Sequence, residues 1–505
     1  MAKKSNINPD QIREAIDAVD DQLLQLFQKR MTLAKDMAEY KTESNAPIYN
    51  KEREDAIIAN VVNQLQQNEK NQLTHLSHEG KAFFERLMTA SRRLQYRQIT
   101  GREPIDYGLV GKSLPYSFSK EIHQMMALYD YHLCEMTPKE LKILLESRCF
   151  KGLNVTIPYK KSIIPFVDVV DKSAAAIGSV NTLYFKDNRL HGANTDYVGF
   201  LWMVQKSGIS YTGKKVLVAG TGGASLTVQR AAAHLGADEI LTVSRKDPIT
   251  YDKIPQDIEI YINATPVGTF PHNGQCNVSL AEFPKLEGVL DLVYNPGKTA
   301  LLLQAEKQGI SFSSGLPMLI AQATASAKLF LDNSHLLLDN ETILNAVEKK
   351  TRNITLIGMP GCGKSTIGRR LAKFLHMKFV DTDALIERKA AMTPSEIITQ
   401  KGEKAFRDLE STVIKKIGKR HGQVIAVGGG AILREENRDA LRQNGPVVYI
   451  RRSVDKLSTY NRPLSSDLQE LYEKRHPLYT VCSDFSVKND AHFSRAFKLI
   501  LQRLT

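Results

Sequence analysis

The chain has 505 residues, of which 42% are hydrophobic and 24% are charged, a balance typical of globular proteins. This length predicts three or four domains. No apolar run reaches the roughly 18 residues that a membrane helix needs, so we expect no membrane span. The start, MAKKSNINPD, lacks the apolar stretch of a secretory signal. The five cysteines form no CxxC pair, which indicates reduced thiols and a cytoplasmic location.

The formal net charge of +13 raises the question of a nucleic-acid partner. However, the lysines and arginines are spread along the chain, without a long basic run or interleaved aromatic residues. A basic balance also suits small anionic substrates. We therefore expect small-molecule substrates and no nucleic acid.

The first hundred residues predict an all-helical region. Asn8 and Pro9 are suited to the N-cap and the first position of one long helix. Arg30 and Lys41 are about three helical turns apart and share one stripe, so both can reach one small anion. Arg13 faces about a quarter turn away and suits a neighbouring chain's pocket. Apolar residues recur at helical spacing at Ile12, Ile16, Val19, Leu23, Leu26, Leu33 and Met37.

Two later segments extend this pattern. NKERED places Arg53 and Glu54 at the start of a second helix, and SRRLQ places Ser91 and Gln95 one turn apart on a third. The region resembles the all-helical chorismate mutase family, and the matching residues are Arg13, Arg30, Lys41, Arg53, Glu54, Ser91 and Gln95.

That resemblance implies a rearrangement of chorismate to prephenate, which needs positioned charges and no nucleophile. The arginines would bind carboxylates, and Lys41 and Gln95 would bind the ether oxygen. A homodimer through these helices is expected, because three helices alone make a thin core. Asn50 stands where the family often has Asp. The alternative is a non-catalytic module that dimerises or senses chorismate or prephenate.

Residues 105–340 alternate between β-like and helical runs, as in α/β folds. KKVLVAGTGGASLTVQ predicts a strand, a glycine turn and a helix of the dinucleotide-binding type. Basic residues after the next strand favour the 2′-phosphate of NADP(H). The predicted cofactor-binding residues are Gly220, Gly222, Gly223, Ala224, Ser225, Ser244, Arg245 and Lys246.

The same segment resembles the shikimate dehydrogenases through GLVGKSLPYSFS, NVTIPYK, GSVNTLYF, GANTDYVGF, INATPVG, DLVYNPGKT and GLPMLIAQA, in that order. The resemblance implies that Lys160 and Asp196 form the catalytic pair. An ammonium near the ketone stabilises the alkoxide that hydride transfer creates. The implied substrate-binding residues are Ser117, Ser119, Thr156, Asn181, Tyr294 and Gln322.

Three positions depart from the dehydrogenase pattern. Lys120 stands in place of a usual Pro, Ala193 in place of a frequent Asp, and Leu226 in place of a frequent Arg. The last change removes one cofactor phosphate contact. A quinate-using relative is the alternative for this segment, and the two retained serines of SFS favour shikimate.

GMPGCGKST, from Gly358, matches the phosphate-binding loop G-x-x-x-x-G-K-[ST] between a predicted strand and helix. The pattern predicts an Mg·ATP site in which Lys364 pairs with the β- and γ-phosphate oxygens. Ser365 would hold Mg²⁺. Asp381 and Asp383 lie on the same side of an extended chain, so one can support the metal while the other faces the acceptor hydroxyl. The predicted nucleotide-binding residues are Gly361, Cys362, Gly363, Lys364, Ser365 and Thr366.

The rest of the C-terminal segment resembles shikimate kinase through FVDTDALIE, GEKAFRDLE, VIAVGGGAIL, NRPLS and EKRHPLY. The resemblance implies that Asp381 supports Mg²⁺ through water and that Arg462 closes over the transferring phosphoryl group. The predicted lid is short and lacks an Arg often found midway. The implied shikimate-binding residues are Asp383, Arg407, Gly429, Gly430 and Arg475.

The sequence therefore predicts a multidomain chain: an all-α domain at 1–100, an α/β domain pair at 105–340 and an α/β P-loop domain at 352–505. The pair would consist of a substrate domain and a Rossmann NADP domain at about 205–305. Predicted linkers are residues 97–106 and 338–352. The expected function is a trifunctional shikimate-pathway enzyme, and the alternative is a bifunctional dehydrogenase and kinase with a non-catalytic helical module.

Overall fold

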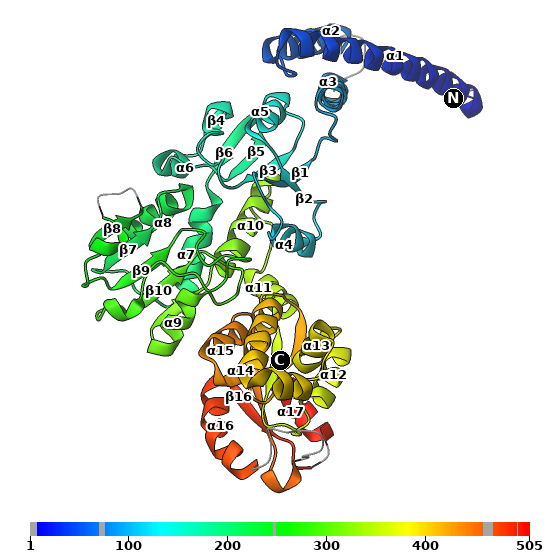
Figure 1. Cartoon of the computed structure of the whole chain (residues 1–505). Coiled ribbons are helices and arrows are strands. Elements are labelled where there is room, and N and C mark those ends of the chain that lie inside the picture. The colour runs from blue at the N-terminus through cyan, green and yellow to red at the C-terminus, as the bar shows by residue number, and fades with distance from the viewer. Residues whose placement is uncertain (1–7, 70–75, 246–248, 458–467, 492, 505) are drawn as a thin grey trace, which may run out of the picture. The chain divides into compact units, whose positions relative to one another are not determined.

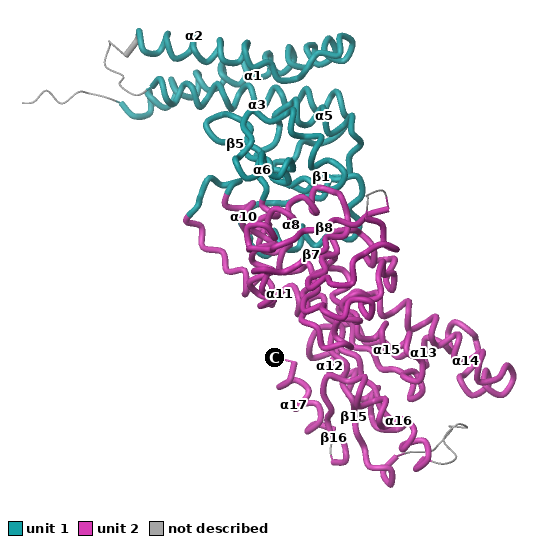
Figure 2. The backbone as a smooth tube through the Cα atoms, turned by 90° about the vertical axis from the view of Figure 1, so that its left-hand side faces the viewer, with its two compact units in different colours: residues 1–194, 329–334 teal, residues 195–328, 335–505 magenta. Residues whose placement is uncertain are grey.

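The computed structural model describes residues 8–69, 76–245, 249–457, 468–491 and 493–504. The chain forms two compact units, residues 1–194 with 329–334 and residues 195–328 with 335–505 (Figure 2). Among the described residues, no helix combines the length and the apolar character needed to cross a membrane.

The first unit begins with a helical region, residues 9–100. It consists of α1 (Pro9–Ser44), α2 (Lys51–Glu69) and α3 (Leu76–Thr100). The side chain of Asn8 accepts a hydrogen bond from the backbone N–H of Asp10 at 3.0 Å, so the predicted helix start is confirmed. Both α1 and α2 pack on α3. Ile48 and Tyr96 join the buried core of the α/β domain that follows, which ties the helices to that domain.

That α/β domain contains a six-stranded mixed sheet with the order β2-β1-β3-β5-β6-β4 (Figure 1). β1, β2 and β3 are parallel, and β5 pairs antiparallel with both β3 and β6. Its elements are β1 (Tyr107–Gly111), α4 (Ser119–Met126), β2 (His132–Glu135), α5 (Pro138–Ser147), β3 (Gly152–Val155), β4 (Val169–Val170), α6 (Lys172–Ile177), β5 (Thr182–Lys186) and β6 (Arg189–Ala193).

The second unit opens with an all-parallel five-stranded sheet of order β11-β10-β9-β7-β8. Helices cover both faces, so its central strands are largely apolar. Val216 and Val218 point into one core cluster, while Leu217 and Ala219 point into the other. Its elements are α7 (Thr195–Ser207), β7 (Lys215–Ala219), α8 (Gly223–His234), β8 (Glu239–Val243), β9 (Ile260–Asn263), β10 (Gly288–Asp291), α9 (Ala300–Gln308), β11 (Ser311–Ser313) and α10 (Leu316–Phe330).

A second all-parallel sheet, with the order β13-β14-β12-β15-β16, forms the core of the P-loop domain. Its elements are α11 (Asn340–Thr351), β12 (Ile354–Ile357), α12 (Lys364–Phe374), β13 (Lys378–Asp381), α13 (Thr382–Ala390), α14 (Pro394–Gly418), β14 (Gln423–Ala426), α15 (Glu435–Arg442), β15 (Val447–Arg451), α16 (Leu468–Cys482), β16 (Phe485–Lys488) and α17 (Phe493–Leu504).

The predicted fold class is confirmed, and the second predicted linker is largely helical. Most of residues 338–352 form α11, whose first N–H groups are capped by the side chain of Asp339. Ile343, Leu344 and Val347 are buried along one face of this helix. The capping aspartate and the i, i+1, i+4 spacing of the apolar residues are helix signals that the sequence contains.

Candidate active sites

Five of the seven residues predicted in the helical region lie together between α1, α2 and α3. Arg30 donates through Nη1 to Ser91 Oγ, and Lys41 Nζ donates to Gln95 Oε1 at 3.1 Å. Ser91 and Gln95 are buried. Burial lowers the pKa of Arg30 and of Lys41, and the carboxylate of Glu54 opposes that shift in both. The site therefore combines two cations and one acid in a partly dry space.

Arg92 belongs to this site and was missed in the sequence. Its Nη1 donates to Glu54 Oε2 at 2.6 Å, and its guanidinium carbon lies 5.1 Å from the centre of the Tyr49 ring. Burial raises the pKa of Glu54, and the charge of Arg92 opposes that effect. The available signal was its position beside Ser91, but an arginine in a charged helix is more often solvated.

Arg13 and Arg53 lie apart from the other five residues. The Arg13 guanidinium pairs with Asp10 at 3.0 Å in the exposed first turn of α1. Arg53 is exposed at the start of α2, where its backbone N–H donates to Asn50 Oδ1 at 2.9 Å. Asn50, the departure from the family pattern, thus caps a helix.

In the first unit, the predicted dehydrogenase residues gather at one edge of the mixed sheet. Two of them follow β1, two follow β3, and one precedes β5, which runs antiparallel to β3. The carboxyl ends of parallel strands and the amino end of an antiparallel neighbour share an edge. Ser117 Oγ lies 3.1 Å from Ser119 Oγ. The residues so placed are Ser117, Ser119, Thr156, Lys160 and Asn181.

In the second unit, Asp196 lies in the first turn of α7 and Gln322 on α10. The two helices approach closely at Gly199, where an added Cβ would lie 2.5 Å from the carbonyl oxygen of Met318. The same Cβ would lie 3.1 Å from Gln322 Cβ, so Asp196 and Gln322 occupy neighbouring helices. Tyr294 follows β10, and Lys160 belongs to the other unit.

The glycine turn after β7 has the shape that the pattern predicts. Gly220 has φ +110°, and a Cβ there would lie 3.1 Å from the carbonyl oxygen of Ala264. Ser225, which replaces the usual third glycine, donates to the carbonyl oxygen of Gly220 at 2.6 Å and so fastens the turn. Gly222 caps α8, followed by Gly223 and Ala224, and a Cβ on Gly222 would meet no other described atom within 4 Å.

Ser244 and the exposed Arg245 follow β8, the neighbour of β7, so they share the edge that carries the glycine turn. Lys246 lies outside the described residues.

The fully buried Asp291, at the carboxyl end of β10 in the same sheet, was missed in the sequence. Burial raises its pKa to about 7, opposed by hydrogen bonds from Thr299 Oγ1, the Val293 N–H and Asn263 Nδ2. These bonds hold both ends of the loop that contains Tyr294.

In the P-loop domain, both predicted residue sets line one cavity of about 1110 Å³ at the carboxyl ends of β12, β13 and β14. Lys364 Nζ donates to the carbonyl oxygens of Gly358 and Met359 at 2.9 and 3.0 Å. Cys362 is fully buried beneath the loop. The predicted residues that line the cavity are Gly361, Gly363, Lys364, Ser365, Thr366, Asp381, Asp383, Arg407, Gly429, Gly430 and Arg475.

The predicted metal ligands lie together. Ser365 Oγ donates to Asp381 Oδ2 at 2.7 Å, and Asp381 also caps α13. An oxygen-only donor set of this kind fits Mg²⁺, which keeps several waters and binds phosphate oxygens. Within the described part of the chain, no group of three or more His, Cys, Asp or Glu residues could hold a metal. Arg462 lies outside the described residues.

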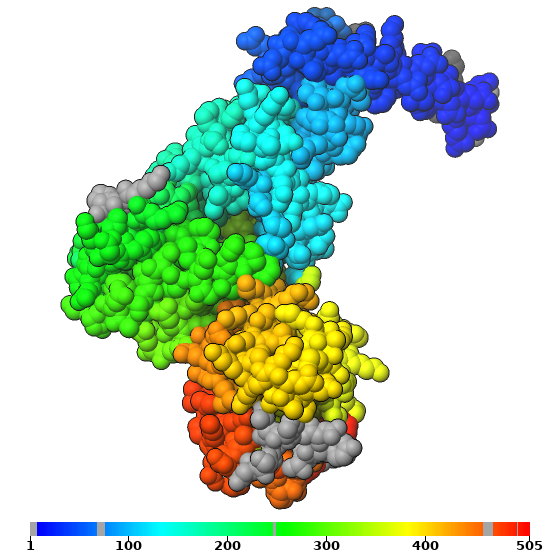
Figure 3. Space-filling view, viewed as in Figure 1, coloured from blue at the N-terminus to red at the C-terminus, as the bar shows by residue number. Residues whose placement is uncertain are grey.

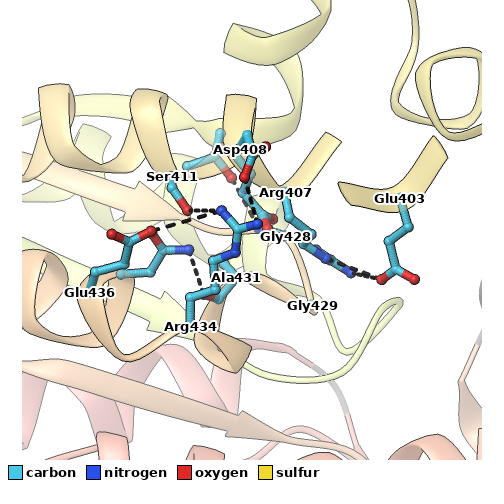
Figure 4. A network of polar contacts seen from close by, with 12 residues as sticks. Glu403, Arg407, Asp408, Ser411, Gly428, Gly429, Ala431, Arg434 and Glu436 are labelled. Carbon is cyan, nitrogen blue, oxygen red and sulfur yellow. Dashed lines mark hydrogen bonds and ion pairs between the residues drawn. The ribbon is translucent and has the colours of Figure 1, made fainter. Parts of the chain in front are cut away.

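In the same cavity as the P-loop, Arg407 contacts two glutamates, and Figure 4 shows its contact with Glu403. It donates to Glu410 at 2.7 Å and to Glu403 at 3.1 Å. Burial opposes its charge, but these two carboxylates outweigh burial and raise the pKa of Arg407, so the guanidinium stays ionised. Glu410 is fully buried and lines the cavity, and sequence reasoning missed it although it lies one turn after Arg407.

The glycine turn and the P-loop, each at the carboxyl edge of a parallel sheet, define two nucleotide-binding domains of an enzyme. Family models match in three places: chorismate mutase type II at residues 12–96, the shikimate dehydrogenase substrate-binding domain at 109–183 and shikimate kinase at 360–505.

Individual relatives match parts of the chain. Shikimate dehydrogenase (NADP(+)) of Clostridium beijerinckii is 32% identical over 253 residues, which cover 45% of this chain and 93% of the relative. Shikimate kinase of Psychromonas ingrahamii is 42% identical over 150 residues, which cover 28% and 88%. A solved chorismate mutase/shikimate 5-dehydrogenase fusion protein from Clostridium acetobutylicum has a TM-score of 0.45 at 31% identity, covering 49% of this chain and 98% of that one.

The chain therefore belongs to the shikimate dehydrogenase family in its middle part and to the shikimate kinase family in its C-terminal part. In its N-terminal helices, residues 12–96 match the family model of chorismate mutase type II. The predicted resemblance to all three families is confirmed.

Proposed function

We propose that this chain catalyses three reactions: NADPH-dependent reduction of 3-dehydroshikimate, ATP-dependent phosphorylation of shikimate at its 3-hydroxyl, and rearrangement of chorismate to prephenate. The product of the first reaction is the substrate of the second. The observation that carries the proposal is the single kinase cavity that contains both the P-loop and Asp383, Arg407 and Arg475.

In the dehydrogenase, hydride from NADPH would reach the ketone carbon, and negative charge would develop on the ketone oxygen. The ammonium of Lys160 would stabilise that charge and deliver a proton, with Asp196 orienting the hydroxyl formed. Ser117 and Ser119, whose hydroxyls lie 3.1 Å apart, would together bind the substrate carboxylate. Arg245 beside the glycine turn would favour the 2′-phosphate of NADPH.

In the kinase, Lys364 would leave the loop carbonyls and bind the β- and γ-phosphates. Ser365 and Asp381 would hold Mg²⁺, which neutralises phosphate charge when it is bound. Arg407, kept charged by Glu410 and Glu403, would bind the shikimate carboxylate. Asp383 would accept the proton of the attacking hydroxyl.

In the mutase region, Arg30 would bind a carboxylate of chorismate, while Lys41 and Gln95 would stabilise charge on the breaking ether oxygen. Glu54, held by Arg92, would accept a hydrogen bond from the substrate hydroxyl. These groups already converge in the described helices, so little reorganisation would accompany the reaction.

A homodimer is part of the proposal. The first half of α1 exposes apolar side chains in a continuous stripe, with exposed fractions of 47% for Ile12, 53% for Ile16, 54% for Val19 and 63% for Leu26. Contiguous exposed apolar side chains of this kind mark interaction surfaces. Arg13 on the same half-helix would then complete a pocket of the second copy.

The test is to supply the purified chain with 3-dehydroshikimate, NADPH, ATP and Mg²⁺, and to measure NADPH oxidation and shikimate 3-phosphate. Lys160→Ala should abolish NADPH oxidation but spare phosphorylation of added shikimate, and Lys364→Ala should do the reverse. If either change silenced both reactions in a folded chain, the assignment of separate sites would be wrong.

Chorismate is tested separately. Lys41→Ala should abolish prephenate formation while the dimer, measured by sedimentation, persists. If the wild type forms no prephenate from chorismate, the helical region is a dimerising or sensing module, which the exposed stripe on α1 favours as the second candidate.

A further inference from the structure

Within the second unit, hydrogen bonds join the kinase to the cofactor-binding domain of the dehydrogenase, and they involve main-chain and side-chain groups of both domains. Asn444 Oδ1 accepts from the N–H of Gly297 at 2.9 Å, and the carbonyl oxygen of Gln443 accepts from the N–H of Lys298 at 2.7 Å. The side chain of Asn273 donates to Gln443 Oε1 at 2.7 Å. The orange surface of the kinase adjoins the green surface of this domain in Figure 3.

Further contacts surround these bonds. His421 Nε2 lies 2.9 Å from Asn295 Oδ1, and Lys419 Nζ donates to the carbonyl oxygen of Pro271 at 2.6 Å. Two clusters of ion pairs flank them, Lys307 with Glu435 and Asp439, and Arg442 with Glu306. Asn295, Gln443 and Asn444 are only 5–6% exposed. Buried amides are costly unless they are hydrogen-bonded, so these residues form a built interface rather than a chance surface contact.

The hydrogen-bonded residues of the interface lie at opposite ends of the strands in the two parallel sheets. On the kinase side, His421 precedes β14, and Gln443 and Asn444 precede β15, so the contact lies at the amino ends of the strands. The kinase cavity lies at the carboxyl ends. On the dehydrogenase side, Asn273 follows β9 and Asn295 follows β10, so the contact lies at the carboxyl ends, where the glycine turn also lies.

We propose that the kinase domain holds the dehydrogenase loop 293–299 in its substrate-binding position, with Asn444, Gln443 and His421 as positioning residues. The inference rests on the proposed function, because its consequence runs through Tyr294, a predicted substrate-binding residue in that loop. The dehydrogenase needs the contact with the kinase. The kinase does not need it, because its cavity lies at the opposite ends of its strands.

The loop's own domain fixes it at its two ends and at Asn295, whose carbonyl oxygen accepts from the N–H of Phe270 at 2.9 Å. Asp291 accepts hydrogen bonds from the N–H of Val293 and from Thr299 Oγ1. Between these anchors, the N–H groups of Gly297 and Lys298 donate to kinase residues. Loss of these bonds would increase the fraction of chains in which the loop is displaced, and apparent substrate affinity falls in proportion to the competent fraction. The change should therefore appear in KM for 3-dehydroshikimate.

Asn444 offers a matched pair of variants in the full-length chain. Its Oδ1 accepts from Gly297 across the interface, while its Nδ2 donates to the carbonyl oxygen of Gly418 within the kinase. Asn444→Ala removes both bonds. Asn444→Asp keeps the acceptor for Gly297 and replaces the internal donor with a carboxylate oxygen that faces the carbonyl oxygen of Gly418. Lys415→Ala, which breaks an exposed pair with Glu436 inside the kinase, controls for nonspecific effects.

Asn444→Ala should raise KM for 3-dehydroshikimate about 5-fold to 10-fold with a smaller change in kcat. Asn444→Asp and Lys415→Ala should stay within about 2-fold of wild type, and KM for shikimate and ATP should stay within the same range in all three. Hydrogen–deuterium exchange should show faster exchange in the peptide spanning 293–299 in Asn444→Ala alone.

Three results would overturn the inference: an unchanged KM for 3-dehydroshikimate in Asn444→Ala, equal impairment in Asn444→Asp, or a parallel loss of kinase activity. The kinase assay on the same sample reports folding, and loop exchange is measured independently of turnover. A wild-type chain that reduces no 3-dehydroshikimate would overturn the proposed function itself, and that failure is seen before any variant is made.

Discussion

Adding one methyl group to the kinase cavity should separate acceptor binding from nucleotide binding. A Cβ on Gly430 would lie 2.3 Å from Nη2, 2.5 Å from Nη1 and 2.6 Å from Cζ of Arg407. Gly430 has φ −100°, so alanine fits the backbone there and the perturbation is steric. Gly430→Ala therefore displaces one guanidinium.

The size of the effect follows from these distances. Non-bonded heavy atoms approach to about 3.5 Å, so the guanidinium must shift by roughly 1 Å. A shift of that size misaligns it with a bound carboxylate, while its bond of 2.7 Å to the fully buried Glu410 resists the movement. Losing a hydrogen bond to a charged group costs about 1.5–3 kcal/mol, which corresponds to about 10-fold to 150-fold in affinity. KM for shikimate should rise by that factor, and KM for ATP should stay within about 2-fold.

The assay is steady-state phosphorylation of shikimate by four chains: wild type, Gly430→Ala, Arg407→Ala and the double variant. Because the methyl group acts through Arg407, Gly430→Ala should add little in the Arg407→Ala background. Additive effects of the two substitutions, or an equal rise in KM for ATP, would refute the reasoning.

Three further changes test other parts of the sites. Asp381→Asn weakens the pair with Ser365 and should raise the Mg²⁺ concentration for half-maximal kinase activity about 10-fold or more, measured by Mg²⁺ titration. Arg92→Ala leaves the mostly buried Glu54 without its ion-pair partner and should cost about 2 kcal/mol, seen as a loss of prephenate formation of roughly 10-fold or more. Burial raises the pKa of Glu54 above 4.5, and the ionised carboxylate is the form proposed to bind the substrate. Prephenate formation should therefore fall as pH drops through that raised pKa. Glu54→Gln should flatten this acid limb of the pH profile.

Local sequence patterns predicted the features that depend on local chemistry. A glycine turn between a strand and a helix, or a P-loop in the same context, fixes backbone direction within a few residues, so the placement of Gly220 and Lys364 followed from the spacing. The long first helix followed in the same way from Asn8, Pro9 and an apolar period of 3.6 residues.

Features that depend on tertiary contacts were not accessible from the sequence. Glu410 and Arg92 read as charges on helix surfaces, and only burial against a partner from another position gives them a role. Ser225 read as a loss of the third glycine, yet its hydroxyl binds the turn that the glycine would have packed against. Asn444 lies in a polar loop with no motif, and its importance depends on a domain more than a hundred residues earlier in the chain.

The arrangement of the two parallel sheets leads to a last prediction about the intermediate. The kinase contacts the cofactor-binding domain through the amino ends of β14 and β15, and its cavity lies at the carboxyl ends of β12, β13 and β14. We therefore expect shikimate to reach the kinase cavity through solvent and not through this contact. In a coupled assay started from labelled 3-dehydroshikimate, added unlabelled shikimate should dilute the label in shikimate 3-phosphate to the ratio found in the free pool. Retention of label above that ratio would show direct transfer and would contradict a route through solvent.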